Sequence, residues 1–304
     1  MTIEQLAMRQ QMVRTLTDIL DEDKRVAVLL GGISVSLFDK SLYRAQPERI
    51  YDVGISEQAM VSMAAGLALE GMIPVVHTIA PFLAERAFEQ IKDDFVYQQI
   101  GGNFVTIGAS YDYSAEGMTH QGSGDVQVLR SLPGMRIVVP GAADEFDTLF
   151  RAHYADGQPT YYRLSERQNS MPQRVRFGRA EVIREGSEKS RATIVAVGPM
   201  LSATLAATEG LDVTVLYYTT VVPFDGETLR SRRPHGHVIL VEPFYAGTLI
   251  PEVTAAMGDI PVRVEAIGVP PRLITRYGTP EQHDHDLGLD VAGIRARVAR
   301  FLET

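Results

Sequence analysis

Hydrophobic and polar positions follow two patterns along the first half of the chain, and together they predict interleaved strands and helices. Short apolar runs rich in β-branched residues are typical of buried strands, and longer stretches with apolar residues every three or four positions are typical of helices. The predicted strands are residues 26–30, 50–55, 74–78, 104–107, 136–139 and 160–163. The predicted helices are residues 4–20, 57 to about 71, 82 to about 99, 126–130 and 143–154. This alternation predicts an α/β fold with a mostly parallel sheet.

The pattern breaks over residues 166–190, which are polar, basic in the middle and without a sustained period. We expect a linker there, followed by a second and smaller α/β unit. Its predicted strands are residues 193–197, 213–217, 237–241 and 262–267, and its helices follow Pro199, lie near Glu227 and cover residues 250–257 and 291–302. The sequence therefore predicts two domains, residues 1–165 and 191–304, each a mostly parallel sheet flanked by helices.

Composition narrows the class of protein. The chain has 304 residues, 45% of them hydrophobic, and a net charge of −9, which argues against a nucleic-acid surface. It contains no cysteine, so disulfides and thiolate metal sites are excluded. The longest nearly apolar run, residues 59–69, is too short to span a bilayer, and the N-terminal helix pattern lacks the basic start of a secretion signal. We expect a cytoplasmic protein that does not bind membranes.

Glu57 stands where a predicted strand runs into a helix. An acid in the first helical turn favours the partial positive charge of the free N–H groups there, so a purely structural role accounts for Glu57 on pattern alone. A functional role for Glu57 would require other functional side chains near it in the fold.

Three polar or aromatic segments follow strands of the same predicted sheet: Glu57, residues 77–82 and residues 116–121. The carboxyl ends of parallel strands form the binding crevice of an open sheet, so these segments predict a site at that edge. The stretch 108–124 is also too long for a simple connector. Taken singly, each side chain also fits a purely structural role: Phe82 fits a core position, and His120 fits a hydrogen-bonded loop residue.

Several stretches of the sequence are similar to the pyrimidine-binding domain of the transketolase and deoxyxylulose-phosphate synthase family. They are DVGISEQAMVSMAAGLALEG (52–71), PFLAERAFEQI (81–91) and EGMTHQGSGDVQVLRSLPGMRIVVPGAADE (116–145). GVP (268–270) and GLDVAGI (288–294) resemble the C-terminal domain of transketolases. The resemblance covers essentially the whole chain and implies a thiamine-diphosphate enzyme.

The resemblance also implies the residues that contact the cofactor. In this family a glutamate hydrogen-bonds the ring nitrogen N1′ of the aminopyrimidine and favours the imino form that removes the proton from the thiazolium carbon. Glu57 matches that catalytic glutamate. Phe82 matches the aromatic residue that stacks on the pyrimidine, and Ile55, beside Glu57, is expected to contact the same cofactor.

Substrate contacts follow from the same resemblance. His120 matches the histidine that touches the sugar oxygens or the developing alkoxide, and Glu116 falls where transketolases usually have Asp. Arg167 and Arg9 match arginines that hold a substrate phosphate, and Ser36 lies in a loop on the same edge. The family's additional histidine before this loop is missing, which suggests a donor or acceptor other than the standard pentose pair.

One family motif is absent. Transketolases hold Mg²⁺ and the cofactor's diphosphate with a GDG motif in a separate amino-terminal domain, and this chain has no GDG. We therefore expect no metal site in this chain. We expect instead a separate partner subunit that carries the diphosphate-binding domain and most of the Mg²⁺ ligands, in an α₂β₂ assembly.

Three functions fit these residues. The first is a subunit of a split transketolase that moves a two-carbon ketol unit between phosphorylated sugars or related metabolites. The second is a decarboxylating subunit, like deoxyxylulose-phosphate synthase or the β subunit of a 2-oxo acid dehydrogenase. The third is a binding partner that retains the fold without activity, and the joint presence of Glu57, Phe82 and His120 argues against it.

Overall fold

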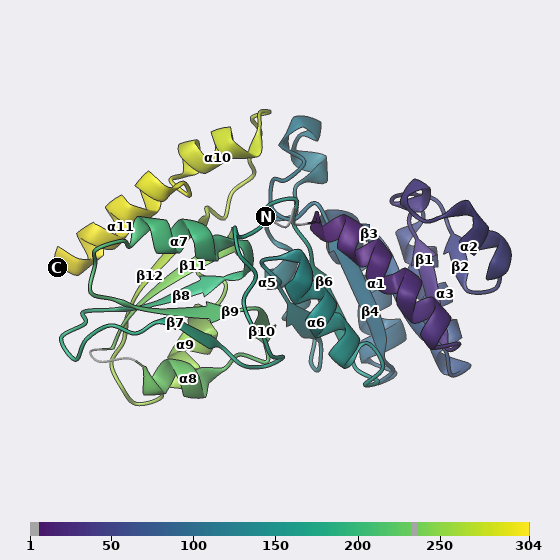
Figure 1. Ribbon diagram of the computed structural model, residues 1–304, viewed down its shortest axis with the longest axis horizontal. Coiled ribbons are helices and arrows are strands. Elements are labelled where there is room, and N and C mark those ends of the chain that lie inside the picture. The colour runs from purple at the N-terminus through teal and green to yellow at the C-terminus, as the bar shows by residue number, and fades with distance from the viewer. Residues whose placement is uncertain (1–5, 233–235, 304) are drawn as a thin grey trace, which may run out of the picture.

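The chain folds into two α/β units, as seen in a computed structural model that describes residues 6–232 and 236–303 (Figure 1). In the described part, the first sheet has the strand order β10 (Thr220–Val222), β5 (Arg136–Val138), β6 (Pro159–Arg163), β4 (Gly102–Ile107), β3 (Ile73–Ile79), β1 (Val26–Leu30) and β2 (Ile50–Asp52). The second has the order β12 (Arg263–Val269), β11 (His237–Tyr245), β8 (Thr193–Val197), β9 (Thr214–Tyr218) and β7 (Glu181–Arg184). All neighbouring strands pair in parallel except β10 with β5 and β7 with β9. The expected fold of two mostly parallel sheets is confirmed.

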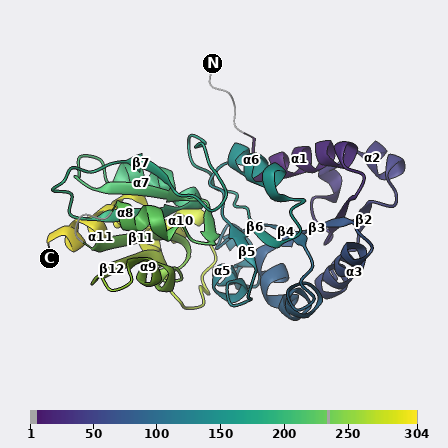
Figure 2. The same ribbon diagram turned by 90° about the horizontal axis from the view of Figure 1, so that it is seen from below.

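Helices cover both faces of the first sheet. They are α1 (Met8–Glu22), α2 (Lys40–Ala45), α3 (Glu57–Leu69), α4 (Phe88–Gln90), α5 (Asp125–Leu129) and α6 (Ala143–His153). Figure 2 shows α1 and α6 on one side of the sheet and α3 and α5 on the other. Every residue of β1 is buried, with Val28 in the core beneath α1 and Leu29 in the core beneath α3. Strands buried on both faces need the nearly continuous apolar runs that the sequence shows.

The second sheet is covered in the same way. Its helices are α7 (Leu201–Ala207), α8 (Gly226–Ser231), α9 (Ile250–Met257), α10 (Pro280–Leu287) and α11 (Val291–Glu303). Helices α7 and α11 pack on one face, and α8 and α9 on the other (Figure 1). None of the helices in the described ranges combines the length and apolar character that a membrane span needs.

Strand β10 ties the two units together. The chain leaves β9 of the second sheet and at once pairs antiparallel with β5 of the first, with Thr220 opposite Val138. The Tyr217 hydroxyl of β9 also donates a 2.6 Å hydrogen bond to Glu145 of α6, and Asn169 donates a 3.0 Å bond to the Gly198 carbonyl. These buried contacts fix the second unit against the carboxyl half of the first.

Most expected elements are present, and the differences have local causes. The helix expected over residues 82–99 consists of two π-helical turns, Phe82–Arg86 and Ile91–Val96, on either side of α4. The helix expected to start at residue 4 starts at Met8, and residues 1–5 lie outside the described part. Helices α2 and α10 and strands β7 and β10 were not expected from the sequence.

The expected linker, residues 166–190, contains strand β7, which pairs with β9 and extends the second sheet. The segment before it runs along the first unit, where Asn169 donates its backbone N–H to the Gly141 carbonyl. The division of the chain at residues 165 and 190 stays a prediction.

Candidate active site

Glu57 is the first residue of α3, and its carboxylate is buried at the carboxyl end of the first sheet. Thr78, near the end of β3, donates a 3.1 Å hydrogen bond to Oε1 of Glu57. Arg86, in the first π-helical turn, donates a 2.6 Å bond from Nη1 to Oε2. A buried carboxylate is costly unless it is paired and hydrogen-bonded, and these two donors provide that. Glu57 is thus a buried carboxylate with both oxygens engaged.

Phe82 and His120 lie beside this pair. The Arg86 guanidinium lies over the Phe82 ring, with its central carbon 4.1 Å from the ring centre. The His120 ring meets Phe82 edge-on, with ring centres 5.1 Å apart. The loops that follow β2, β3 and β4 therefore meet at one edge of the sheet, and this part of the sequence prediction is confirmed.

The long loop between β4 and α5 is anchored by buried polar groups that the sequence reading missed. Arg163, at the end of β6, is almost completely buried and donates a 2.7 Å bond to Asp125. The same guanidinium donates a 2.9 Å bond to the Ser110 hydroxyl and a 3.3 Å bond to the Gly122 carbonyl. Ser110 and Gly122 also pair as an isolated bridge. Both ends of the loop are thus closed on Arg163, and His120 lies two residues before the anchored Gly122.

Arg167 is bound by carboxylates of two elements. Its Nη1 donates bonds of 2.6 and 2.7 Å to Asp284 of α10, and its Nε lies 3.5 Å from Asp112. The guanidinium stacks over Tyr111, whose hydroxyl also donates to Asp284. Burial raises the pKa of Asp112, and the nearby Arg167 charge acts in the opposite direction. Because α10 belongs to the second unit, Arg167 joins the two units.

The other expected substrate residues are more open. Arg9, in the first turn of α1, is half-buried and donates a 2.8 Å bond from Nε to the Ser34 hydroxyl. Ser36 is exposed in a 3₁₀ turn after β1, and Glu116 is exposed in another turn of the long loop. Ile55 is 78% exposed in the loop before α3. Ile55 is thus an exposed apolar side chain two residues before the buried Glu57 carboxylate.

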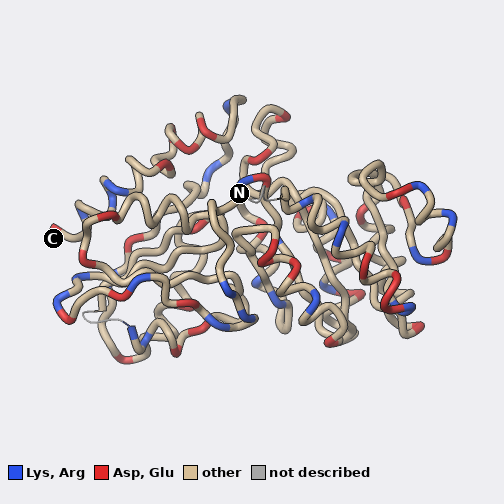
Figure 3. Tube along the Cα trace, viewed as in Figure 1, with Lys and Arg blue, Asp and Glu red and all other residues tan. Residues whose placement is uncertain are grey.

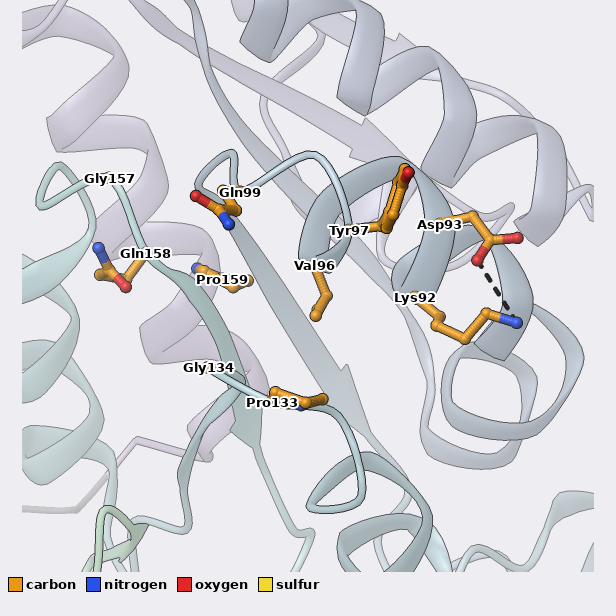
Figure 4. A pocket seen from close by; sticks show the side chains of 10 residues that line it. All are labelled: Lys92, Asp93, Val96, Tyr97, Gln99, Pro133, Gly134, Gly157, Gln158 and Pro159. Carbon is orange, nitrogen blue, oxygen red and sulfur yellow. Dashed lines mark ion pairs between the residues drawn. The ribbon is translucent and has the colours of Figure 1, made fainter.

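A separate hollow of about 790 Å³ lies at the opposite edge of the sheet, where β4 and β6 begin (Figure 4). Its charged lining is one exposed pair, Lys92 and Asp93, 3.4 Å apart, and Tyr97 beside them is exposed. These side chains are all solvent-exposed, and none of them is held by buried contacts as Glu57 is. The candidate site is the edge that carries Glu57.

Charged side chains are spread over both units, and they do not gather into a metal site in the described residues. Figure 3 shows basic residues interspersed with acidic ones along both units. In residues 6–232 and 236–303, no group of three or more His, Cys, Asp or Glu side chains is placed to hold a metal ion.

Comparison with known proteins identifies the class of this chain. Residues 4–171 match the family model for the transketolase pyrimidine-binding domain, and residues 178–294 match the model for the transketolase C-terminal domain. The chain therefore belongs to the transketolase family, whose members depend on thiamine diphosphate.

Individual relatives show what the match covers. An uncharacterised 33.6 kDa protein of the fasciation locus of Rhodococcoides fascians is 41% identical, covering 95% of this chain and 92% of the relative. A 1-deoxy-D-xylulose-5-phosphate synthase of Magnetococcus marinus is 31% identical over 91% of this chain, which spans only 45% of that enzyme. A 6-deoxy-6-sulfo-D-fructose transketolase subunit of a Clostridium species is 31% identical, covering 88% of this chain and 86% of the relative.

Among solved structures, a split-gene transketolase described as an inactive β4 tetramer has a TM-score of 0.84 and 28% identity, with 98% of this chain and 99% of that chain covered. The family models and this solved structure agree: the chain corresponds to the pyrimidine-binding and C-terminal domains of a transketolase, in the arrangement of a split-gene subunit.

Proposed function

We propose that this chain is the β-type subunit of a split, thiamine-diphosphate-dependent transketolase that transfers a two-carbon ketol unit between sugars. The observation that carries the proposal is the buried Glu57 carboxylate, set against Arg86 and Phe82 at the carboxyl end of the sheet. A scaffold protein has no need for this combination. The split-gene transketolase and the sulfofructose transketolase subunit support a transferase reaction for a chain of this length.

The residues fit the aminopyrimidine of the cofactor. Arg86 makes two contacts that a flat nitrogen heterocycle would also make here, a hydrogen bond to Glu57 and a stacked contact on Phe82. Arg86 occupies both positions in this structure and would have to move aside for the cofactor. Glu57 would then accept a hydrogen bond from a ring nitrogen, and Phe82 would provide the flat apolar face. Thiamine diphosphate, when bound, supplies an acidic thiazolium carbon that can carry the ketol unit.

The remaining roles follow from position. Glu57, which is buried, would hold a proton at the ring nitrogen and so set the tautomer of the aminopyrimidine. His120, whose ring meets the Phe82 ring edge-on, would donate a hydrogen bond to a substrate oxygen on which negative charge develops. Ile55 would pack on the cofactor and exclude water, while Ser36 and Glu116 would contact hydroxyl or phosphate groups of the substrate.

Two arginines are candidates for a substrate phosphate. Arg167 would have to leave Asp284 and Asp112 to bind an anion, whereas the described hydrogen bond of the Arg9 side chain, to Ser34, uses only Nε. We therefore rank Arg9 first for this role in the present arrangement and Arg167 second.

We further propose that a partner subunit supplies the diphosphate-binding domain and Mg²⁺ ligands, in an α₂β₂ assembly. Two proteins that match over nearly their whole length support this division, namely a split-gene transketolase and a 6-deoxy-6-sulfo-D-fructose transketolase subunit. The apolar surface at Ile55 is available for such a partner. The absence of nucleic acid as a partner and a cytoplasmic location stay predictions.

A decarboxylating reaction is the second candidate. Sequence identity of 31% to a deoxyxylulose-phosphate synthase favours it as much as the identity to the sulfofructose enzyme favours ketol transfer. Ketol transfer has the additional support of the split-gene structure.

The test uses the chain mixed with an amino-terminal transketolase subunit encoded beside it, with thiamine diphosphate and Mg²⁺. Fructose 6-phosphate and an aldose phosphate serve as donor and acceptor, and pyruvate replaces the donor in a parallel assay. Ketol transfer only in the mixture, lost in Glu57→Ala, supports the proposal. Release of CO₂ from pyruvate without ketol transfer would instead support the second candidate.

A further inference from the structure

A chain of hydrogen bonds connects Arg9 to the interior of the first sheet. Arg9 Nε lies 2.8 Å from the Ser34 hydroxyl, and that hydroxyl lies 2.8 Å from Nε2 of His77. The other ring nitrogen of His77, Nδ1, lies 2.9 Å from the Val105 carbonyl. These residues come from α1, the loop after β1, β3 and β4, which are far apart in the sequence.

The direction of each hydrogen bond is fixed. The Val105 carbonyl can only accept, so Nδ1 of His77 carries a proton. His77 is completely buried in β3, and this burial, with Arg9 nearby, lowers its pKa to about 4. Nε2 is therefore unprotonated at neutral pH and accepts from the Ser34 hydroxyl. The Ser34 oxygen is left to accept from Arg9 Nε, so every donor in the series has one acceptor.

The backbone at Ser34 supports the same interpretation. Ser34 has φ +60° and ψ −2°, a left-handed conformation that is uncommon for a residue with a side chain. Its side chain is almost fully buried. Such a conformation persists where the surroundings hold it, and here the hydroxyl is held between His77 and Arg9. Ser34 is thus a fixed point on which the Arg9 side chain rests.

The outer edge of Arg9 remains open. In residues 6–232 and 236–303, the recorded hydrogen bond of the Arg9 side chain is the one from Nε to Ser34, and no carboxylate pairs with its guanidinium. Arg167 differs, because Asp284 and Asp112 already balance its charge. A guanidinium held through Nε presents Nη1 and Nη2 as a fork suited to two oxygens of an oxyanion.

We propose that Ser34 and His77 are positioning residues that hold Arg9 so that its outer nitrogens bind the anionic end of a sugar substrate. This rests on the proposed ketol transfer for the identity of the substrate, a ketose that carries a terminal phosphate or another oxyanion. Neither residue touches the substrate. They set the direction of the guanidinium, and so the preference for charged over uncharged sugars.

The first experiment is steady-state ketol transfer by the assembled two-subunit enzyme, with fructose 6-phosphate and with fructose. His77→Asn keeps an N–H for the Val105 carbonyl but leaves Ser34 without its acceptor, and Ser34→Ala removes the hydroxyl. Both should raise KM for fructose 6-phosphate about tenfold or more, as expected for a weakened charge-assisted bond, and leave kcat and the reaction with fructose unchanged. His77→Gln, whose side-chain oxygen reaches towards Ser34, should stay within about threefold of the original KM.

The second experiment measures binding of inorganic phosphate to the same assembly by calorimetry, without turnover. Phosphate should bind about tenfold more weakly in His77→Asn and Ser34→Ala and nearly normally in His77→Gln. Unfolding midpoints of all three variants are measured alongside. If His77→Asn does not fold, the positioning role is tested by comparing phosphate binding in Ser34→Ala and in His77→Gln.

The two experiments distinguish failure of the positioning role from failure of the proposed ketol transfer. Normal phosphate binding and normal KM in Ser34→Ala, or equal losses with charged and uncharged ketose, would overturn the positioning role. Absence of phosphate binding in the unaltered assembly would overturn it as well. Phosphate binding that depends on Ser34 and His77 in an assembly without ketol transfer would retain the anion site and reject the proposed reaction.

Discussion

Arg86 Nη1 lies 2.6 Å from Glu57 Oε2, and the same guanidinium stacks 4.1 Å from the centre of the Phe82 ring. The Glu57 side chain is 1% exposed and the Arg86 side chain 37% exposed, so the carboxylate depends on a partner that itself reaches solvent. Arg86 thus stabilises the buried Glu57 carboxylate as an ion pair and lies on the same Phe82 ring that we propose for the aminopyrimidine.

Replacing Arg86 with Met should leave the Glu57 carboxylate buried with Thr78 as its one described donor. We expect the free energy of unfolding to fall by about 1–3 kcal/mol, less than for a fully buried pair because Arg86 is partly exposed. Glu57→Gln added to Arg86→Met should restore part of that loss, since the unpaired charge is removed. Urea unfolding is measured for the original chain, Arg86→Met, Glu57→Gln and the double variant, and additive losses would show that the two side chains are not coupled.

Asp284→Asn should release Arg167 from its strongest described partner and so provide a second cation near the substrate side. We expect KM for a phosphorylated ketose to fall several-fold, and the stability to fall by about 1–3 kcal/mol because a charge-assisted contact between the two units is lost. The measurements are steady-state kinetics and thermal unfolding of the assembled enzyme. An unchanged KM in both Asp284→Asn and Arg167→Gln would make this pair purely structural.

Glu242, in β11, gives the second unit a pH-dependent stability. It is fully buried and accepts hydrogen bonds from the backbone N–H groups of Gly247 and Leu249, at 2.6 and 2.8 Å. Burial raises its pKa from 4.5 to about 8, although these two hydrogen bonds oppose the shift. The folded chain therefore holds a proton on Glu242 at pH values where the unfolded chain has lost it.

Between pH 4.5 and about 8 the folded state binds more protons at Glu242 than the unfolded state does. The contribution of Glu242 to the free energy of unfolding therefore decreases as pH rises. The total decrease is on the order of a few kcal/mol. The free energy of unfolding of the original chain minus that of Glu242→Gln should therefore decline from pH 5 to pH 8.5. A difference that grows over this range would contradict the raised pKa.

Arg163 should control the order of the loop that carries His120. Arg163→Met removes the donor to Asp125, Ser110 and Gly122 and leaves the Asp125 charge buried, which costs about 3–5 kcal/mol when one partner of a buried pair is lost. Limited proteolysis should then cut within residues 108–124 much faster than in the original chain. Arg163→Met with Asp125→Asn is the matched control and should recover part of the stability. Equal cleavage rates would show that the loop is held by other contacts.

Parts of this site were accessible from sequence. Glu57, Phe82 and His120 each follow a predicted strand, and parallel strands bring their carboxyl ends together. Arg86 was missed, although it lies four residues after Phe82 in a helical segment and so on the same face, a signal that the sequence does contain. Ser34 and His77 are 43 positions apart and carry no comparable signal.

The sequence by itself determined the class of fold and the family. Apolar runs bounded by polar turns specify buried parallel strands, because burial depends on the local alternation of residue types, and the ordered motifs around Glu57 and His120 specify the transketolase family. What only the tertiary structure decided is which partner each charged side chain has. Arg167 is neutralised by Asp284 from the second unit, while Arg9 rests on Ser34 and His77. The physical reason is that charges interact over a few ångströms in space, and the residues that meet there come from strands and helices whose separation along the chain does not reveal their contact.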